Sequence, residues 1–350
     1  MQVPSLEIEF FDVVSEEKSG DAITIRYGDF TDVRNQTVIV IDGGTIETGK
    51  RIVNHIRSIY GTNYIDLMIS THPDGDHASG LREILREMSV GALWMHQPWE
   101  HSEAIREMFR DGRLTDNSLS EKLRNAYRYA HELEEIAIEK EVPIFEPFVG
   151  MSFDNSTIQV LGPTLDYYRE LMPDFAKTPS AKDSLFRKAF TGIKESINWI
   201  KETMDYETLD ESGETSGENN SSTVLLFKFQ GDNYLFTGDV GIPALKNVIE
   251  YSKLIGVNLK GLRWMQVPHH GSRRNVSPSI LDEINAPTAY ISAAKDSEKH
   301  PSKKVINALI RRGSKVYSTE GNSLRHHRNA KARPGYGAAT PHQFYNEVPE

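Results

Sequence analysis

The chain has 350 residues, which is enough for one large domain or two ordinary ones, and it contains no cysteine. The absence of cysteine excludes disulfide bonds, cysteine-ligated zinc and thiol catalysis. The formal net charge of −10 argues against broad, non-specific binding of duplex nucleic acid, for which proteins usually present a basic surface.

The sequence shows neither a leader pattern nor a membrane span. Residues 1–11 lack a basic stretch followed by an apolar run. No stretch approaches the roughly 18 consecutive apolar residues of a membrane-spanning helix. Because a cysteine-free chain also suits a reducing compartment, we expect a soluble cytoplasmic protein that makes no contact with a membrane.

The first third of the chain alternates strand and helix patterns. β-rich runs bounded by turn residues predict strands over residues 6–14, 22–27, 37–41 and 65–70. Helical spacing of apolar residues predicts helices over about 48–60 and 78–88. A polar loop, 71–80, joins the last of these strands to the last helix.

Two helical stretches, at about 100–141 and 164–218, interrupt this pattern, with a strand predicted between them at 157–161. The second stretch is expected to be helical to about residue 208. It ends in the acidic Ser/Gly segment 210–218, which predicts a mobile surface loop. Because strand patterns resume after each stretch, we interpret both as insertions into a β-framework.

Strand patterns return after residue 221. Strands are predicted over 223–229, 234–236, 262–267, 289–291 and 315–317, and helices over about 242–255, 277–285 and 302–312. Strands and helices in both halves predict a layered α/β sandwich. We expect a single domain over residues 1–324 and a basic, loosely ordered tail over 325–350.

Four potential metal ligands fall within six residues directly after a predicted strand: His72, Asp74, Asp76 and His77. Pro73 and Gly75 let the loop fold back, so that its side chains converge. We expect His72 and Asp74 to reach one ion, and Asp76 and His77, which begin the helix, to reach a second. Imidazole and carboxylate groups are ligands of Zn²⁺, Mn²⁺ and Fe. A capped surface turn would explain Asp76 alone, so the loop predicts a metal site.

Two later strand ends carry further candidate ligands. Asp239 closes a Thr-Gly-Asp turn after the strand 234–236, where a carboxylate shared by two metals would lie. His269 and His270 follow the strand 262–267. Because adjacent residues of an extended chain point to opposite faces, we expect only one of them to be a direct ligand. We favour His270 as the ligand and His269 as a substrate contact or a group supporting the ligands, and the reverse order stays open.

Taken together, these motifs resemble those of metallo-β-lactamase-fold hydrolases. Residues 72–77, His-Pro-Asp-Gly-Asp-His, are similar to the H-x-[HD]-x-D-H signature of that family. The subgroup that includes the hydrolase domain of ComEC-type competence proteins is resembled by a further set: Asp42-Gly43-Gly44, Asn219-Asn220-Ser221-Ser222, Thr237-Gly238-Asp239, His269-His270-Gly271-Ser272 and His300-Pro301. The motifs run from Asp42 to about Gly321 and leave the two helical stretches uncovered. The resemblance implies an αββα sandwich with the metals at one edge of its two sheets.

The chain departs from the broad family at two positions. Asp74 stands where many members have histidine, and the Asn219 to Ser222 stretch stands where a later histidine usually completes the first metal site. The first site therefore has fewer nitrogen and more oxygen donors. Donor hardness then shifts its preference from Zn²⁺ towards Mn²⁺, or leaves the site weak until substrate binds. We expect two divalent metal ions, Zn or Mn.

The resemblance implies a metal-dependent hydrolase that uses a water bridged by two divalent metals. Phosphodiesterase or nuclease activity is the interpretation it favours. Hydrolysis of a non-phosphate ester, thioester or lactone on the same site is one alternative. A partner-binding effector subunit with a degenerate metal site is another, and the intact Asp76, His77 and Asp239 speak against it.

Other residues are assigned roles around these metals. We expect Asp76, His269 and His300 to be catalytic, and we expect substrate contacts from Asn220, Ser222, Ser272 and Arg273. Arg273 would place a guanidinium against phosphate, although a solvated loop explains it equally well. The helical insertions leave and rejoin the framework near strand ends on the metal side. They predict either a roof that admits only nucleotides or single-stranded nucleic acid, or a docking face for a protein partner.

Overall fold

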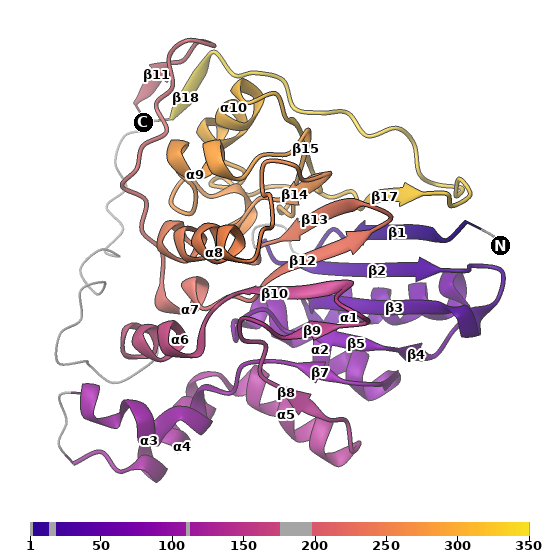
Figure 1. The fold of residues 1–350 in the computed structure, drawn as a ribbon, viewed down its shortest axis with the longest axis vertical. Helices are drawn as coiled ribbons and strands as arrows, with labels where there is room; N and C mark the ends of the chain where they lie inside the picture. Colours follow the sequence, from indigo (N-terminus) through magenta and orange to yellow (C-terminus); the bar gives the residue numbers. More distant parts are fainter. Residues whose placement is uncertain (1–2, 14–18, 110–112, 176–197, 350) are drawn as a thin grey trace.

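The computed structural model describes residues 3–13, 19–109, 113–175 and 198–349. Two seven-stranded sheets pack face to face, and helices cover the outer face of each (Figure 1). This is the αββα sandwich that the sequence predicts. Within the described residues, no helix is both long enough and apolar enough to span a bilayer.

The strands of both sheets follow in spatial order. The first sheet consists of β17 (Leu324–Arg328), β1 (Ser5–Phe10), β2 (Ala22–Gly28), β3 (Gln36–Gly43), β5 (Leu67–Ile69), β7 (Leu93–Trp94) and β8 (Ile144–Phe145). The second consists of β16 (Lys315–Ser318), β15 (Thr288–Ile291), β14 (Trp264–Gln266), β13 (Asp232–Phe236), β12 (Val224–Phe229), β10 (Ile158–Gly162) and β9 (Ser152–Phe153). Two short ribbons pair β4 (Tyr64–Ile65) with β6 (Ser89–Val90), and β11 (Trp199–Lys201) with β18 (Glu347–Pro349).

The helices divide between the two outer layers and the insertions. They are α1 (Ile46–His55), α2 (Gly75–Glu87), α3 (Ser102–Ile105), α4 (Asp116–Ala126), α5 (Arg128–Glu139), α6 (Leu165–Leu171), α7 (Gly217–Asn220), α8 (Ile242–Leu254), α9 (Pro278–Glu283) and α10 (Lys303–Arg311). The first sheet is covered by α1, α2 and α5, and the second by α8, α9 and α10.

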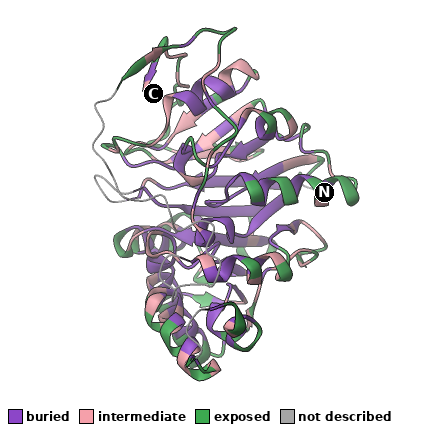
Figure 2. Ribbon diagram, turned by 90° about the vertical axis from the view of Figure 1, so that its left-hand side faces the viewer, coloured by how far each residue is buried: buried purple, intermediate pink, exposed green. Residues whose placement is uncertain are grey.

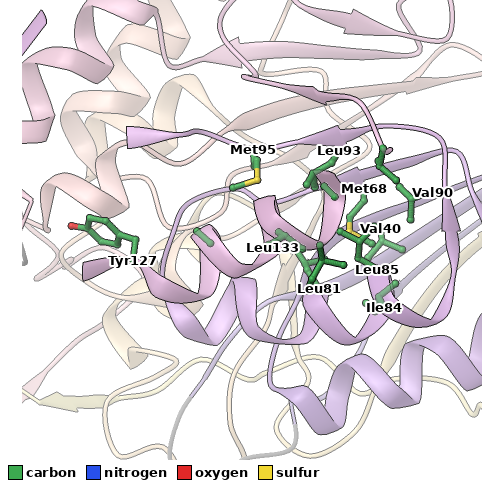
Figure 3. Close-up of a cluster of buried hydrophobic side chains, with 14 of the residues drawn as sticks. Val40, Met68, Leu81, Ile84, Leu85, Val90, Leu93, Met95, Tyr127 and Leu133 are labelled. Atoms are coloured by element: carbon green, nitrogen blue, oxygen red, sulfur yellow. The ribbon is translucent and has the colours of Figure 1, made fainter. Parts of the chain in front are cut away.

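Apolar side chains fill three layers. Between the sheets, alternate residues of β1 (Leu6, Ile8 and Phe10) point inward and are fully buried, as the two-residue period of a strand requires. The central strands of both sheets accordingly appear buried along most of their length in Figure 2. Outside the first sheet, α2 directs Leu81 and Leu85 onto the strands (Figure 3). Their spacing of four residues is one turn of a helix.

Close backbone contacts set α2 against the end of β3. A Cβ atom on Gly80 would lie 1.9 Å from the carbonyl oxygen of Gly43, and one on Gly49 would lie 2.4 Å from that of Gly80. Only glycine permits these approaches. They bring the start of α2, and with it the polar loop that follows β5, to the carboxyl end of β3.

The carboxyl ends of parallel strands meet at one edge of the sandwich. β3 pairs in parallel with β5, and β13 with β14, so the loops after β5, β13 and β14 gather there. The amide nitrogen of Thr223, just before β12, donates to the carbonyl oxygen of Thr71 over 2.9 Å and ties the two sheets together. This edge is where the resemblance places the metals.

The helical insertions differ in part from expectation. α5 lies in the crossover between the parallel strands β7 and β8 and packs against α2, so it belongs to the outer layer of the sandwich. Residues 176–197, part of the second predicted helical stretch, lie outside the described residues. Residues 199–208 are not helical: they contain β11, which pairs with β18 at the far end of the chain. Helical spacing alone did not reveal that long-range partner.

The acidic segment 210–218 is anchored to the body of the protein. The Glu211 carboxylate accepts hydrogen bonds from the Ser279 amide and hydroxyl, at 2.8 and 2.6 Å. A Cβ atom on Gly213 would lie 2.5 Å from the Arg274 carbonyl oxygen. The segment ends in the short α7, whose residues are buried. These contacts differ from the mobile surface loop that composition predicts.

The prediction of a loosely ordered tail is wrong for residues 325–328, and the predicted boundary after residue 324 falls inside a strand. β17 pairs antiparallel with β1 and extends the first sheet. The reason is electrostatic. Glu7 and Glu9 of β1 are almost fully buried, and the tail neutralises them through Arg325 on Glu7 and Arg333 on both, with Arg333 Nη1 2.7 Å from Glu9 Oε1.

Candidate metal centre

Asp239 lies at the centre of the polar edge. The Nε2 atoms of four histidines surround its Oδ2: that of His77 lies 3.5 Å away, that of His269 3.7 Å, and those of His72 and His270 3.8 Å. Three of the four histidines are almost fully buried, whereas the side chain of His269 is 28% exposed. Ligand atoms that share one ion lie roughly 3 to 4 Å apart, because each is about 2 Å from the metal. The spacing therefore matches a shared metal shell.

The turn that carries Asp239 is held from several sides. Gly238 adopts a φ of 52°, which favours glycine, and a Cβ atom there would lie 3.1 Å from the Ser222 Cβ and 3.2 Å from the Thr71 Cβ. The Asp239 amide donates to the Ser222 hydroxyl over 3.2 Å. The Asn275 amide donates to the Asp239 carbonyl oxygen over 2.9 Å. The carboxylate is thus fixed without using its own oxygens.

The far nitrogens of three histidines contact oxygens that can only accept. His77 Nδ1 lies 2.8 Å from Asp42 Oδ2, and His270 Nδ1 lies 2.9 Å from the Ser292 carbonyl oxygen. His269 Nδ1 lies 2.9 Å from the Asn275 side-chain oxygen. Each Nδ1 therefore donates its proton to these oxygens, so Nε2 is the nitrogen that offers a lone pair to an ion beside Asp239 when the ring is neutral, as metal binding requires. Metal-binding histidines are usually held in this way.

Asp42 also holds His72 through one intervening hydroxyl. The Thr71 hydroxyl donates to Asp42 Oδ2 over 2.6 Å and has His72 Nδ1 3.1 Å away, while the Thr71 amide donates to Asp42 Oδ1 over 2.9 Å. Because the Thr71 proton is used on Asp42, His72 Nδ1 donates to the hydroxyl oxygen. One carboxylate at the end of β3 thus orients two of the predicted ligands.

The donor set fits divalent cations. Among the described residues, the buried atoms without a hydrogen-bond partner include His72 Nε2, His77 Nε2 and Asp239 Oδ1, together with Asp21 Oδ1. Buried polar atoms normally have partners, so several orphans meeting at one point indicate a missing ligand. Four groups of three side chains have ligand atoms within 4.8 Å of one another: His72–His77–Asp239, Asp76–His77–His270, Asp21–Asp239–His270 and Asp21–Asp42–His77.

The structure brings together all six predicted metal ligands. Asp74 immediately precedes α2, and its Oδ2 lies 3.8 Å from His72 Nε2. Asp76 lies on the first turn of α2, with a carboxylate oxygen within 4.8 Å of ligand atoms of His77 and His270. Sequence reasoning missed Asp21 and noted Asp42 only as part of a motif. Nothing local distinguishes Asp21, because its neighbours in space come from other strands.

The charges of the site interact strongly. Burial disfavours an ionised Asp239, but the imidazoles of His270, His77 and His269 outweigh burial and hold its pKa well below the ordinary value. Burial likewise opposes a charged His77, yet Asp239 and Asp42 raise its pKa well above the usual range. Burial raises the pKa of Asp21 and lowers that of His72. The candidate metal centre thus contains three buried carboxylates, Asp21, Asp42 and Asp239, which need positive charge nearby.

The expectation that adjacent histidines diverge is wrong at His269 and His270. Both residues have positive φ, 48° and 57°, in the left-handed region. The backbone turns there instead of running extended, so the alternation of a strand does not apply and both Nε2 atoms face Asp239. Left-handed backbone at two successive non-glycine residues costs on the order of 1 kcal/mol or more each, and such strain gathers at functional sites.

His300 lies beside this pair. Its ring centroid is 5.4 Å from that of His269 and 6.3 Å from that of His270. Burial, reinforced by the two neighbouring imidazoles, lowers the pKa of His300 to about 3. Its Nδ1 is buried and has no hydrogen-bond partner among the described residues. The ring is therefore neutral and has a nitrogen available next to the partly exposed His269.

The residues predicted to contact substrate have different surroundings. Ser222 holds the Asp239 amide, and the Asn220 side-chain oxygen accepts from the Gly241 amide over 3.2 Å. The Ser272 hydroxyl accepts from the Arg274 amide over 3.2 Å. These contacts support the loops of the site. Arg273 is exposed on the loop after the histidine pair. The assignment of these residues to substrate stays a prediction.

An apolar groove lies beside the centre, behind Asn220 and Ser222. It lies between β10, α6 and α8 and measures about 300 Å³ when the space open to solvent is included. Its remaining lining is Val149, Leu161, Gly162, Pro163, Thr164, Tyr167, Val224, Val240, Ala244, Asn247, Val248 and Tyr251.

A family profile and a curated relative match parts of this chain. Residues 33–295, more than half of the chain, match the sequence profile of the Metallo-beta-lactamase superfamily. The chain is 27% identical over 152 residues to "ComE operon protein 3" of Bacillus subtilis (strain 168). That match covers 43% of this chain and 19% of the relative, so the chain spans about a fifth of the length of this curated relative.

Similar solved structures include the CmlA beta-hydroxylase E377D mutant and a metallo-beta-lactamase mutant from Cronobacter sakazakii. The first is 11% identical, with a TM-score of 0.43, and the match covers 94% of this chain and 54% of that one. The second is 11% identical, with a TM-score of 0.32, and the match covers 73% and 75%. From the profile match across most of the two-sheet core, the chain belongs to the metallo-beta-lactamase superfamily.

Proposed function

We propose that this protein is a metal-dependent phosphodiesterase that holds two divalent ions on either side of Asp239. The observation that carries the proposal is the set of four histidine Nε2 atoms 3.5 to 3.8 Å from Asp239 Oδ2. A carboxylate with several imidazoles on one of its oxygens suits a ligand shared by two metals.

The protein's own side chains divide between two positions. His72 and Asp74, whose ligand atoms are 3.8 Å apart, would hold one ion with Asp239. Asp76, His77 and His270 would hold the other. When bound, two such ions lower the pKa of a water and clamp the attacking and leaving oxygens of a displacement at phosphorus. Carboxylates outnumber imidazoles around the first ion, which favours Mn²⁺ over Zn²⁺ there.

Two imidazoles are placed to act on the substrate. His269 is the most exposed of the histidines around Asp239, and the neutral ring of His300 lies beside it at a tilt. A neutral imidazole donates a hydrogen bond to a phosphoryl or leaving oxygen without changing charge. Arg273, exposed on the adjoining loop, supplies a guanidinium for phosphate. The motif resemblance to ComEC-type hydrolase domains favours phosphodiesters over other esters.

The insertions favour small or single-stranded substrates. α3 contacts α6, and α6 contacts α7, which leads into the Asn219 to Ser222 stretch of the site. Tyr129, at the start of α5, lies against the metal loop, since a Cβ atom on Gly75 would be 2.7 Å from its ring. Tyr129, from the 100–141 segment, thus narrows the mouth of the site beside the metal loop. Nucleotides or single-stranded nucleic acid fit such a mouth better than a duplex, and a protein partner on the outer insertion surface is compatible with it.

A second candidate is hydrolysis of a non-phosphate ester, thioester or lactone. The apolar groove behind Asn220 and Ser222 favours it, because an acyl chain would bury apolar area there. The groove has no guanidinium or ammonium group in its lining, so it does not by itself bind phosphate. The absence of cysteine also suits action in the reducing cytoplasm for either activity.

One set of assays tests both candidates. Protein loaded with Mn²⁺ or Zn²⁺ is assayed on bis-p-nitrophenyl phosphate, p-nitrophenyl acetate, single-stranded DNA and duplex DNA. The proposal expects phosphodiester turnover that disappears in Asp239→Asn and persists in His327→Ala, a control on an exposed histidine of β17. Turnover of the acetate alone would favour the second candidate. Cleavage of duplex DNA as fast as single strands would refute the idea that the helical insertions keep a duplex out of the site.

A further inference from the structure

Asp21 is a buried carboxylate on the protein side of the metal centre. It immediately precedes β2 and is 1% exposed. One of its oxygens lies within 4.8 Å of ligand atoms of both Asp239 and His270. Its Oδ1 has no hydrogen-bond partner in the described part of the chain. An unpaired buried carboxylate oxygen is costly, so the position requires a cation or a proton.

The backbone around Asp21 is tied to three other parts of the site. The Asp21 carbonyl oxygen accepts from the Gly44 amide over 2.8 Å, and the Ser19 hydroxyl accepts from the Ala294 amide over 3.0 Å. A Cβ atom on Gly20 would lie 2.4 Å from the Asp76 carbonyl oxygen, so glycine lets this segment press against α2. The carboxylate is thus held close to the centre from both sides.

Gln266, the last residue of β14, connects Asp21 to the turn of Asp239. Its Nε2 donates to Asp21 Oδ2 over 2.7 Å. Its Oε1 accepts from the amides of Thr237 and Gly238, at 3.0 and 3.3 Å. One side-chain amide therefore sets both carboxylates, and it occupies only one oxygen of Asp21.

We propose that Asp21 is a direct ligand of the metal ion that Asp239 and His270 hold. The inference rests on the two-metal site of the proposed function and adds a ligand that the signature motifs do not contain. The third carboxylate makes this ion's shell richer in oxygen, which favours Mn²⁺ over Zn²⁺. It also gives the buried charge of Asp21 its missing partner.

A cysteine placed at this position reports direct coordination. The chain has no cysteine, so Asp21→Cys introduces a single thiol, and thiolate bound to Co²⁺ absorbs in the near ultraviolet by charge transfer. Thr24→Cys is the matched control, because Thr24 is fully buried on β2 with its hydroxyl 2.8 Å from that of Tyr60, away from the ligands. We expect visible cobalt absorption in all three proteins and the charge-transfer band in Asp21→Cys alone.

The outcomes separate the two levels of the proposal. No cobalt absorption in the unmodified protein would contradict the two-metal site itself. Cobalt absorption in every protein, without a charge-transfer band in Asp21→Cys, would overturn the role of Asp21. If Asp21→Cys does not fold, Asp21→Asn decides by metal analysis after gel filtration. We expect it to keep about one Mn²⁺ per chain where the unmodified protein keeps about two, and retention of both would overturn the inference.

Discussion

Asp42 Oδ2 lies 2.8 Å from His77 Nδ1, and neither side chain is exposed to solvent. The same oxygen receives the Thr71 hydroxyl, through which it also supports His72. Asp42 contacts the Nδ1 side of both rings and not their Nε2 atoms, and it therefore determines the tautomer of two candidate ligands. Its own φ of 54° is one that aspartate and asparagine tolerate better than most residues.

Replacing Asp42 should weaken metal binding without removing a ligand. In Asp42→Asn the backbone conformation is retained, but an amide holds the imidazoles less firmly than a carboxylate. We expect metal affinity to fall about 10- to 100-fold, the usual range for such supporting groups. Competition with a chromophoric chelator measures the change. An affinity within a factor of two of the unmodified protein would show that Asp42 does not support the ligands.

Asp76→Ala should separate activity from stability. Asp76 is only half-buried and lies on the first turn of α2, so its removal leaves no cavity in the core. We expect turnover to fall on the order of 10²-fold or more, and the urea midpoint of the metal-free protein to change little. Turnover near that of the unmodified protein would remove Asp76 from the site. Asp166→Ala, an acidic residue on α6, is the control.

His96 should make the protein less stable in mild acid. It is buried, stacks on Tyr168 at 4.6 Å between ring centroids, and lies with Nε2 3.2 Å from the Thr223 hydroxyl. Burial lowers its pKa from 6.5 to about 3. Below pH 6.5 His96 therefore becomes protonated in the unfolded chain but stays neutral in the folded protein. Stability from this residue is complete above pH 6.5 and declines as the pH falls towards 3, by up to ~1.4 kcal/mol per unit.

The comparison with His96→Asn isolates this effect, because asparagine cannot titrate. Urea denaturation of the metal-free proteins at several pH values between 6 and 4 gives two slopes of unfolding free energy against pH. We expect the slope of the variant to be shallower, since all other histidines contribute equally to both. Parallel slopes would mean that folded His96 takes up its proton freely.

Removing one partner of a buried ion pair in the C-terminal segment should lower the free energy of unfolding more than removing both partners. Arg333 contacts the fully buried Glu9, which also accepts from the Tyr336 hydroxyl over 2.8 Å. Arg333→Met leaves that carboxylate without its guanidinium, and we expect a loss of about 3 kcal/mol. Adding Glu9→Gln removes the buried charge as well and should recover part of that loss. Free energies from urea denaturation test this, and equal losses in the single and double variants would contradict it.

The six candidate metal ligands could be predicted because their residue types and spacing are visible in the local sequence. The run from His72 to His77 follows an apolar strand and reaches into the start of a helix, so its donors lie close together in one short loop. Asp239 and His270 were recognisable for the same reason, as polar groups at the ends of predicted strands. The alternation of strands and helices likewise determined the layered sandwich, since each apolar face must be covered by another element.

Other features of the centre and the fold depend on partners that are distant in sequence, and only the tertiary structure revealed them. Asp21 becomes part of the centre because β2 lies beside β3 and because Gln266, 245 residues away, holds it. The basic tail becomes a strand because its arginines meet buried glutamates of β1. His269 joins His270 in facing Asp239 because the chain turns there with positive φ, a conformation imposed by contacts around the turn. Local propensity carries no record of such contacts, because they form only when the sheets pack.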